Sequence, residues 1–228
     1  MSFILDVFAS RQGEGLRVGE PQVFVRFGGC NLVCNYCDTP ESIPEKAGFS
    51  VTLQELIERI AKLDQGVPGS VVSLTGGEPL LQIAFLEQLL PLLKKSQRRV
   101  YLETNGTLPQ ALERVIGHCD WVAMDIKPPS ATEHDFWEAH RWFLNVGGDK
   151  IFVKMVLTGQ TTEAEFLRAV NLVAGVRRDI PFILQPATDW GTAQSIPMAR
   201  LVSWWGQASH CLKDVRILPQ IHRLWEIP

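Results

Sequence analysis

Three of the five cysteines lie in one short stretch, as Cys30, Cys34 and Cys37. Thiolates gathered so closely are typical metal ligands. A structural zinc site normally has four protein ligands and an electron-transfer iron–sulfur cluster usually takes four cysteines, whereas this stretch offers three. A [4Fe–4S] cluster held here would keep one iron without a protein ligand and open to another molecule. The alternatives are a three-cysteine zinc site completed by a distant histidine, or three reduced structural thiols.

The spacing of three residues and then two, with Tyr36 directly before the last cysteine, resembles the signature of the radical S-adenosylmethionine (SAM) enzymes. In that family the open iron chelates SAM, and the cluster donates the electron that cleaves it. A second motif, Thr75-Gly76-Gly77-Glu78-Pro79, follows a short apolar run of strand type. Its glycines offer backbone amides to a ligand, and in radical SAM enzymes a Gly-Gly-Glu at this place binds the amino group of SAM.

Composition narrows the class of protein. The 228 residues fit one domain, 1–228, and the contents of 46% hydrophobic and 21% charged residues are ordinary for a globular protein. A net charge of −3 and a pI near 6.0 predict no direct nucleic-acid partner and favour a small-molecule substrate. The chain begins without a basic and then apolar leader and has no stretch of transmembrane length, so we expect a cytoplasmic protein that does not bind a membrane.

Strand-like and helix-like segments alternate along most of the chain. Capping boxes at Thr52 and Thr162 predict helices over 53–63 and 163–174, and the segment 40–50 is polar and turn-rich, typical of a flexible connection. Strands are expected at 3–8, 23–27, 70–74, 100–102, 121–124, 151–157, 181–184 and 215–218. This order predicts an α/β fold built from parallel βαβ units. About six units are too few for a closed eightfold barrel, so we expect a partial, open (β/α)6 barrel of the radical SAM type with short N- and C-terminal extensions.

Five further fragments point to one branch of that superfamily. They are Gln12-Gly-Glu-Gly15, Cys37-Asp-Thr39, Glu103-Thr-Asn-Gly-Thr107, Leu184-Gln-Pro186 and Leu218-Pro-Gln-Ile-His222. Together, from residue 12 to residue 222, they resemble the 7-carboxy-7-deazaguanine synthase family. The resemblance implies conversion of 6-carboxy-5,6,7,8-tetrahydropterin to 7-carboxy-7-deazaguanine by radical ring contraction with loss of ammonia, in the queuosine and 7-deazapurine pathway.

The resemblance also implies site residues, and none of them is a side-chain acid or base, because the radical comes from SAM. The three cysteines would hold the [4Fe–4S] cluster, and Thr39 would bind Mg²⁺ together with the substrate. The positions matching SAM contacts are Gly77, Asp125, Ile126, Lys127, Gln185, Pro186, Ala187 and Thr188. Those matching substrate contacts are Arg11, Gln12, Gly13, Glu14, Arg26, Thr75, His222 and the terminal carboxylate of Pro228.

Two of these residues have chemistry that suits a pterin. Arg26 suits the substrate carboxylate, although a lone charge in this strand could also mark a sheet edge. Glu14 suits the guanidine-like edge, where a carboxylate can accept two hydrogen bonds. Arg11 departs from the family pattern, in which an apolar residue is expected before Gln12.

The resemblance further implies an electron donor of flavodoxin or ferredoxin type and a homodimer, for which an apolar patch around Trp204 and the C-terminal tail would be suited. Two rival functions stay open. One is a different radical SAM enzyme such as a glycyl-radical activase. The other is a non-catalytic iron–sulfur or zinc protein that binds a partner.

Overall fold

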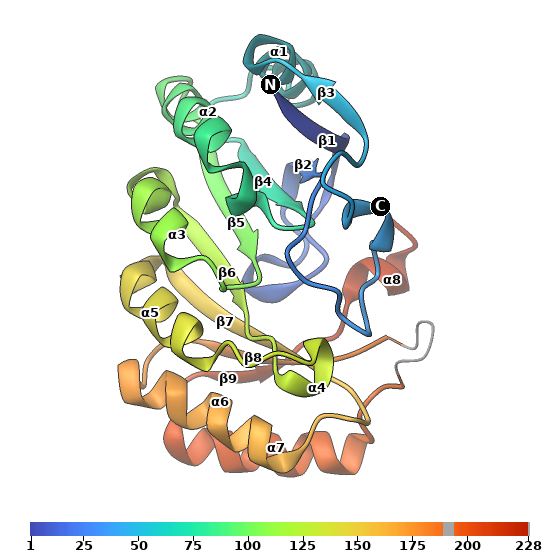
Figure 1. Cartoon of the computed structure of the whole chain (residues 1–228), viewed down its shortest axis with the longest axis vertical. Coiled ribbons are helices and arrows are strands. Elements are labelled where there is room, and N and C mark those ends of the chain that lie inside the picture. Colours follow the sequence, from blue (N-terminus) through green and yellow to red (C-terminus); the bar gives the residue numbers. More distant parts are fainter. Residues whose placement is uncertain (189–193, 228) are drawn as a thin grey trace.

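The computed structural model describes residues 1–188 and 194–227. Its strands form one nine-stranded sheet in the order β3-β1-β2-β4-β5-β6-β7-β8-β9 (Figure 1). The strands are β1 (Ser2–Arg11), β2 (Pro21–Phe27), β3 (Phe49–Val51), β4 (Val71–Gly76), β5 (Arg99–Thr104), β6 (Trp121–Asp125), β7 (Ile151–Leu157), β8 (Phe182–Pro186) and β9 (Val215–Ile217). Strands β2 and β4 to β9 are parallel, and β1 pairs antiparallel with β2 and β3. Within the described residues β9 does not pair with β3, so the predicted open α/β barrel is confirmed.

Most of the helices cover the outer, convex face of the sheet, while α8 (Ile221–Trp225) and the cysteine loop lie on its concave side (Figure 1). The helices are α1 (Leu53–Leu63), α2 (Ile83–Lys95), α3 (Pro109–Val115), α4 (Pro129–Thr132), α5 (Trp137–Gly147), α6 (Glu163–Val176), α7 (Met198–Cys211) and α8 (Ile221–Trp225). Both predicted capping boxes form, at Thr52 and Thr162. Each satisfies backbone N–H groups that the first helical turn leaves without intrahelical partners.

Side chains alternate between the two faces of each strand, and the two faces differ in chemistry. Residues such as Val25, Leu102 and Met155 point outward into the main core beneath the helices. On the concave side a smaller apolar cluster closes the amino end of the barrel, made of Val71, Tyr101, Ala123, Phe152 and Ile183. Polar residues follow these positions toward the carboxyl ends of the strands, where ligands bind in parallel α/β folds.

Some expectations about the secondary structure were wrong. The segment 40–50 is not an irregular connection, because it contains the 3-10 turn Pro40–Ser42 and strand β3, which pairs with β1 at the sheet edge. Helix α8 was not foreseen, since five residues carry too little periodicity to reveal a helix. Arg26 does not mark an edge, because β2 lies between β1 and β4. None of the helices in residues 1–188 and 194–227 is long and apolar enough to cross a membrane.

Candidate active site

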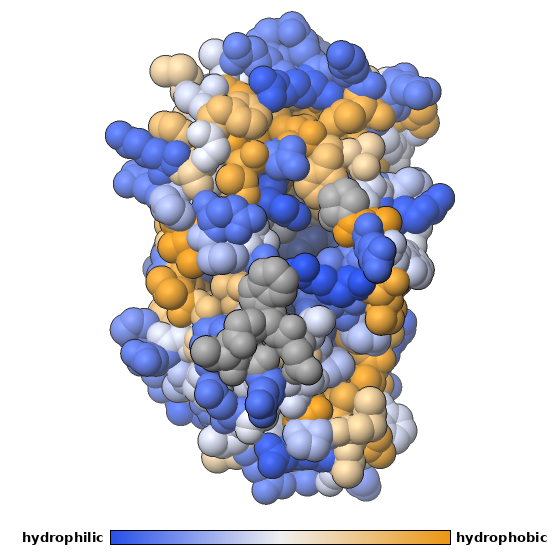
Figure 2. Space-filling model, turned by 90° about the vertical axis from the view of Figure 1, so that its right-hand side faces the viewer, coloured by the Kyte–Doolittle hydropathy of each residue, from blue (hydrophilic) through white to orange (hydrophobic). Residues whose placement is uncertain are grey.

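One pocket opens at the carboxyl ends of the parallel strands, and Figure 2 shows this face as hollow, with strongly hydrophilic residues inside it. Six neighbouring strands, β2 and β4 to β8, each direct a polar residue near the carboxyl end into the pocket. These residues, here called the polar ring, are Arg26, Thr75, Glu103, Asp125, Lys154 and Gln185. The cysteine loop and the segment after β9 complete the walls.

The three clustered cysteines all line this pocket, in the loop that follows β2. They are free and half-buried. Burial raises the pKa of all three thiols, that of Cys30 to about 11, so the apoprotein keeps them protonated. A cationic metal centre would reverse this, because a coordinating thiol is deprotonated. Three cysteines converging on one end of a pocket therefore fit a cluster with one open iron.

Gly76, the last residue of β4, and Gly77, which follows it, are required by the close approach of the chain around Phe27 and Gly29. A Cβ atom on Gly77 would lie 2.1 Å from the carbonyl oxygen of Gly29, at the start of the cysteine loop. The N–H of Gly77 donates to Phe27 O at 3.0 Å and that of Glu78 to Gly29 O at 2.8 Å. Gly77 does line the pocket, but these two N–H groups are already engaged, contrary to our expectation of free amides.

Glu78 turns its side chain away from the pocket, where it is fully buried. Its carboxylate accepts hydrogen bonds from the backbone N–H of Asn105 at 2.8 Å and of Leu80 at 3.0 Å, and from the hydroxyl of Thr104. Burial raises its pKa to about 7 although these bonds favour the charged form. Glu78 therefore joins the ends of β4 and β5.

Asp125, Lys127 and Gln185 lie on the side of the pocket formed by β6 and β8. Lys127 Nζ donates to Asp125 Oδ2 at 2.8 Å and lies 4.9 Å from the ring centre of Tyr36. Among the residues that the structure describes, Asp125 Oδ1 and both amide atoms of Gln185 are buried without a hydrogen-bond partner. Unsatisfied buried polar atoms are costly, so this wall fits a bound ligand with both donors and acceptors.

Glu14, in the loop after β1, forms a buried ion pair with Lys154 of β7, the strand between β6 and β8. Glu14 Oε1 also accepts from Gln220 Nε2 at 2.8 Å. Burial alone would raise the pKa of Glu14, but the charge and hydrogen bond of Lys154, the hydrogen bond of Gln220 and the charge of His222 together outweigh it and lower that pKa to about 2. Lys154 in turn lies 3.9 Å from the carboxylate of Asp125, so a single cation lies near both carboxylates.

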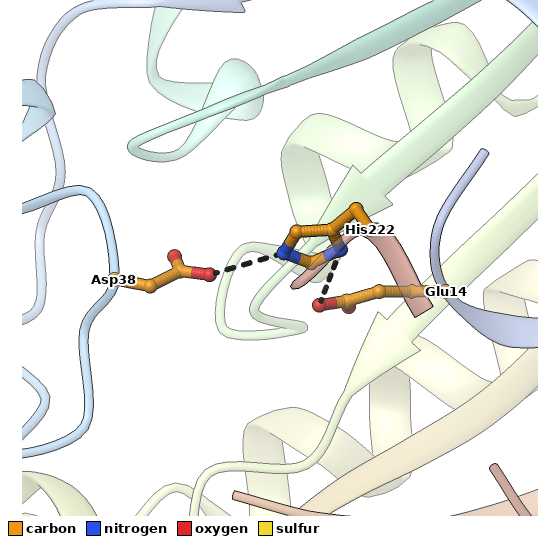
Figure 3. A group of neighbouring side chains, drawn as sticks. All are labelled: Glu14, Asp38 and His222. Atoms are coloured by element: carbon orange, nitrogen blue, oxygen red, sulfur yellow. Dashed lines mark ion pairs between the residues drawn. The ribbon is translucent and has the colours of Figure 1, made fainter. Parts of the chain in front are cut away.

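His222 lies between two carboxylates, with Nδ1 4.0 Å from Glu14 and Nε2 3.9 Å from Asp38 (Figure 3). The three side chains offer ligand atoms within 4.8 Å of one another, a spacing that a metal ion could use. Gly13 permits this placement, because a Cβ atom there would lie 2.4 Å from His222 Cβ. Ile221 N donates to Gly13 O at 2.9 Å, so the segment after β9 packs directly on the loop after β1.

The remaining predicted substrate positions contact one another or stack. Gln12 Nε2 donates to Glu103 at 2.8 Å, and Thr75 lies 3.5 Å from the same carboxyl. Arg26 stacks over Phe8, with its guanidinium 5.2 Å from the ring centre. Arg11 is exposed at the rim, where its guanidinium donates to the carbonyl oxygen of Gly19.

The structure brings most of the predicted site residues to this pocket. Thr39, Ala187 and Thr188 also line it, whereas Ile126 is packed in the main core and Pro186 is outside the lining. Pro228 lies outside the described residues. Sequence reasoning did not assign Lys154, Tyr36, Glu103 and Gln220 to the site. A lone lysine in the apolar stretch Ile151–Leu157 was the available signal for Lys154, since a buried cation normally has a partner.

Comparison with known proteins agrees with this arrangement. Residues 24–173 match the model of the Radical SAM superfamily. The chain is 41% identical to a 7-carboxy-7-deazaguanine synthase of Geobacter sulfurreducens over 96% of this chain and 94% of that one. It is 37% identical to a protein of the same name from Methanothermobacter thermautotrophicus, covering 96% and 95% of the two chains.

Solved structures show the same fold at lower identity. The crystal structure of QueE from Escherichia coli matches with a TM-score of 0.67 and 22% identity, covering 97% of this chain and 94% of that one. A radical SAM methyltransferase from Sphaerobacter thermophilus matches with a TM-score of 0.63 and 12% identity, covering 93% and 77%. The predicted resemblance is confirmed, and the chain belongs to the 7-carboxy-7-deazaguanine synthase family of the radical SAM superfamily.

Proposed function

We propose that residues 1–228 act as one domain that converts 6-carboxy-5,6,7,8-tetrahydropterin to 7-carboxy-7-deazaguanine with loss of ammonia. The observation that carries the proposal is one pocket lined by the three cysteines, by Asp125 and Gln185 with their unsatisfied polar atoms, and by Glu14 paired with Lys154. Cluster, SAM and substrate would therefore meet in one pocket, as radical transfer requires. The names of the relatives support the same reaction.

Cys30, Cys34 and Cys37 would hold the [4Fe–4S] cluster. When bound together with SAM, the reduced cluster would supply the one-electron chemistry that yields a carbon radical. Asp125 Oδ1 and the Gln185 amide would take hydrogen bonds from SAM in place of the partners they lack. The proposed SAM contacts of Gly77, Lys127, Ala187 and Thr188 agree with their place in the lining, whereas buried Ile126 would act only through its backbone.

Glu14 would receive the guanidine-like edge of the pterin. Lys154 keeps its carboxylate charged, and charged acceptors form the stronger hydrogen bonds. Oε1 is now engaged with Gln220, which the pterin would displace or share. Arg26 would bind the substrate carboxylate, since its side chain lines the pocket and its guanidinium stacks over the ring of Phe8. Gln12, Gly13, Thr75, Arg11 and His222 would complete the substrate walls, as would the carboxylate of Pro228.

Thr39 would give its hydroxyl oxygen to a Mg²⁺ ion shared with the substrate. Its Oγ1 lies 3.2 Å from Asp38 Oδ1, so a second hard oxygen is at hand. A Thr39→Ala variant should need more Mg²⁺ for half-maximal turnover, whereas Thr39→Ser keeps the oxygen and should not. Equal Mg²⁺ dependence in all three proteins would remove Thr39 from the ligands.

The electron would come from a donor of flavodoxin or ferredoxin type. We also propose a homodimer, but not through the patch predicted around Trp204, which is buried and stacked on Phe166. Helix α7 instead exposes Met198, Val202 and Trp205 along one side, an apolar strip suited to a second copy. Sedimentation of the protein and of a Val202→Lys variant would test this.

The deciding experiment is anaerobic turnover with the reconstituted cluster, SAM, Mg²⁺, a strong reductant and the tetrahydropterin, read by mass spectrometry. Formation of 7-carboxy-7-deazaguanine without matching loss of SAM would establish the proposal. Slow, uncoupled 5′-deoxyadenosine alone would keep the enzyme class and reject the substrate. Intact SAM in a cluster-loaded sample would favour a non-catalytic binding protein.

A further inference from the structure

Three side chains form a closed ring of hydrogen bonds between the cysteine loop and the loop after β5. Asn105 Nδ2 donates to Asn31 Oδ1 at 2.9 Å, and Asn31 Nδ2 donates to Thr107 Oγ1 at 2.9 Å. Thr107 Oγ1 donates to Asn105 Oδ1 at 2.6 Å and so closes the ring. Every member donates to the next and accepts from the previous one. Such chains polarise each other cooperatively.

The ring is anchored on the protein interior through Asn105, which is itself buried. Its N–H donates to the buried carboxylate of Glu78 at 2.8 Å. Its carbonyl oxygen lies 3.2 Å from Nε2 of His140, which must carry the proton because a carbonyl only accepts. His140 is fully buried on α5, and Glu78 also donates its own N–H to Gly29. The anchor therefore joins β4, β5 and α5 to the cysteine loop.

Asn31 directly follows Cys30, the first of the three cluster cysteines. Backbone hydrogen bonds hold the chain up to Cys30. Cys30 N donates to Ile43 O at 3.0 Å and Gly29 N to Ser42 O at 2.8 Å, in the turn after the loop, and Glu78 N, just after β4, donates to Gly29 O at 2.8 Å. None of these three bonds reaches the end of β5, so the Asn31 side chain adds the link from the residue after Cys30 to that strand end.

We propose that Asn105, acting through Asn31 and Thr107, is a positioning residue that holds Cys30 at the site of the cluster before the cluster binds. Loss of the ring should leave the fold intact but widen the range of positions open to Cys30. The iron bound through Cys30 would then be the first to be lost. The inference depends on the cluster and not on the identity of the substrate.

The test compares Thr107→Val, which removes the hydroxyl at nearly constant shape, with Thr107→Ser, which retains it. Two hydrogen bonds of the ring are lost in the first variant and none in the second. Iron loss from the reconstituted protein to an excess of chelator, followed anaerobically, should be about 5- to 30-fold faster in Thr107→Val. Thr107→Ser should lose iron at the wild-type rate, and so should Asn145→Ala, which removes an exposed asparagine side chain of α5.

Asn31→Ala breaks the ring from the exposed side and guards against a folding defect at Thr107. It should reproduce the faster iron loss, while circular dichroism of the apoprotein stays unchanged. The EPR spectrum of the reduced cluster should broaden in both ring-breaking variants and sharpen again in Thr107→Ser. Wild-type iron loss and an unchanged spectrum in Asn31→Ala and Thr107→Val would overturn the proposal.

Discussion

Substitution of Lys154 is the most decisive test of the site, because this one buried cation lies close to several carboxyl groups. It lies in β7, all seven residues of which are buried, and it pairs with Glu14 while facing Asp125 at 3.9 Å. Replacing it with methionine keeps the length and removes the charge. The carboxylate of Glu14 would then lie in a buried site without its compensating cation.

The size of the effect follows from the pKa of Glu14. Lys154 and the other partners hold that pKa at about 2, against 4.5 for a free glutamate. A difference of this size corresponds to about 3 kcal/mol in favour of the charged form. Breaking a buried ion pair by removing one partner costs about 3–5 kcal/mol. We therefore expect Lys154→Met to lower the free energy of unfolding by about 3 kcal/mol or more at pH 7.5.

A double-mutant cycle measured by urea unfolding of the apoprotein separates charge from packing. In the Glu14→Gln background Lys154→Met should cost at least about 2 kcal/mol less than in the wild type, because no carboxylate remains at position 14. Lys154→Arg, which retains the charge, is the matched control. Equal costs of Lys154→Met in the two backgrounds, within about 0.5 kcal/mol, would refute the electrostatic reasoning.

The pH dependence of the stability of Lys154→Met gives a second, independent test of the electrostatic reasoning. In the wild type the low pKa of Glu14 contributes stability that is present above pH 4.5 and lost as the pH falls toward 2. Without Lys154 burial would be opposed only by the weaker effects of Gln220 and His222 and would raise the pKa of Glu14, so protonation of this carboxylate would reduce the destabilisation of the variant as the pH falls. The deficit of Lys154→Met should accordingly be smaller at pH 5 than at pH 7.5. A deficit independent of pH would indicate lost packing alone.

Two further predictions use other parts of the pocket. Gly13→Ala places a methyl group against the segment after β9. In calorimetry this variant should bind the pterin at least about tenfold more weakly, while its binding of SAM persists. Gly117→Ala, which has open space around the added methyl group, should change neither affinity. Burial lowers the pKa of His140 to about 4, so the fold loses stability as the pH falls below 6.5. Between pH 7.5 and 5.0 the free energy of unfolding, measured with urea, should fall by about 2 kcal/mol less in His140→Gln than in the wild type. An equal fall in both proteins would mean that His140 is protonated in the folded protein.

The sequence was enough to predict the alternating architecture, for identifiable reasons. The bounds of α1 and β7 were expected as observed, because the apolar residues of α1 recur at helical spacing over the whole element and those of β7 form a stretch interrupted by Lys154 alone. The three-residue strand β3 and the five-residue helix α8 were missed, because each depends on a partner distant in the sequence. Short elements of this kind gain their stability from tertiary contacts and not from local preference.

The site was predictable where chemistry shows in residue type and spacing, as in the cysteine loop. It was not predictable where a motif residue has a structural role. Gly77 is a glycine because Gly29 passes 2.1 Å from where its Cβ would be, and Glu78 binds β5 instead of facing a ligand. Motif spacing alone cannot distinguish a residue that contacts a ligand from one that stabilises the surrounding structure. The positions of the partner atoms in the structure can distinguish the two.

The polar ring shows how the fold makes one site from residues of six strands that are far apart in the sequence but adjacent in the sheet. Glu103 pairs with Ala123, two residues before Asp125, and the partner of Lys154 on β8 is likewise two residues before Gln185. The strands of a barrel tilt, so residues that lie at one level along the barrel axis advance by about one position from each strand to the next. Because inward and outward positions alternate along a strand, this advance occurs in steps of two residues. The steps in register are therefore what keeps the ring level. One residue inserted between Ala123 and Asp125 would turn this carboxylate outward into the apolar core.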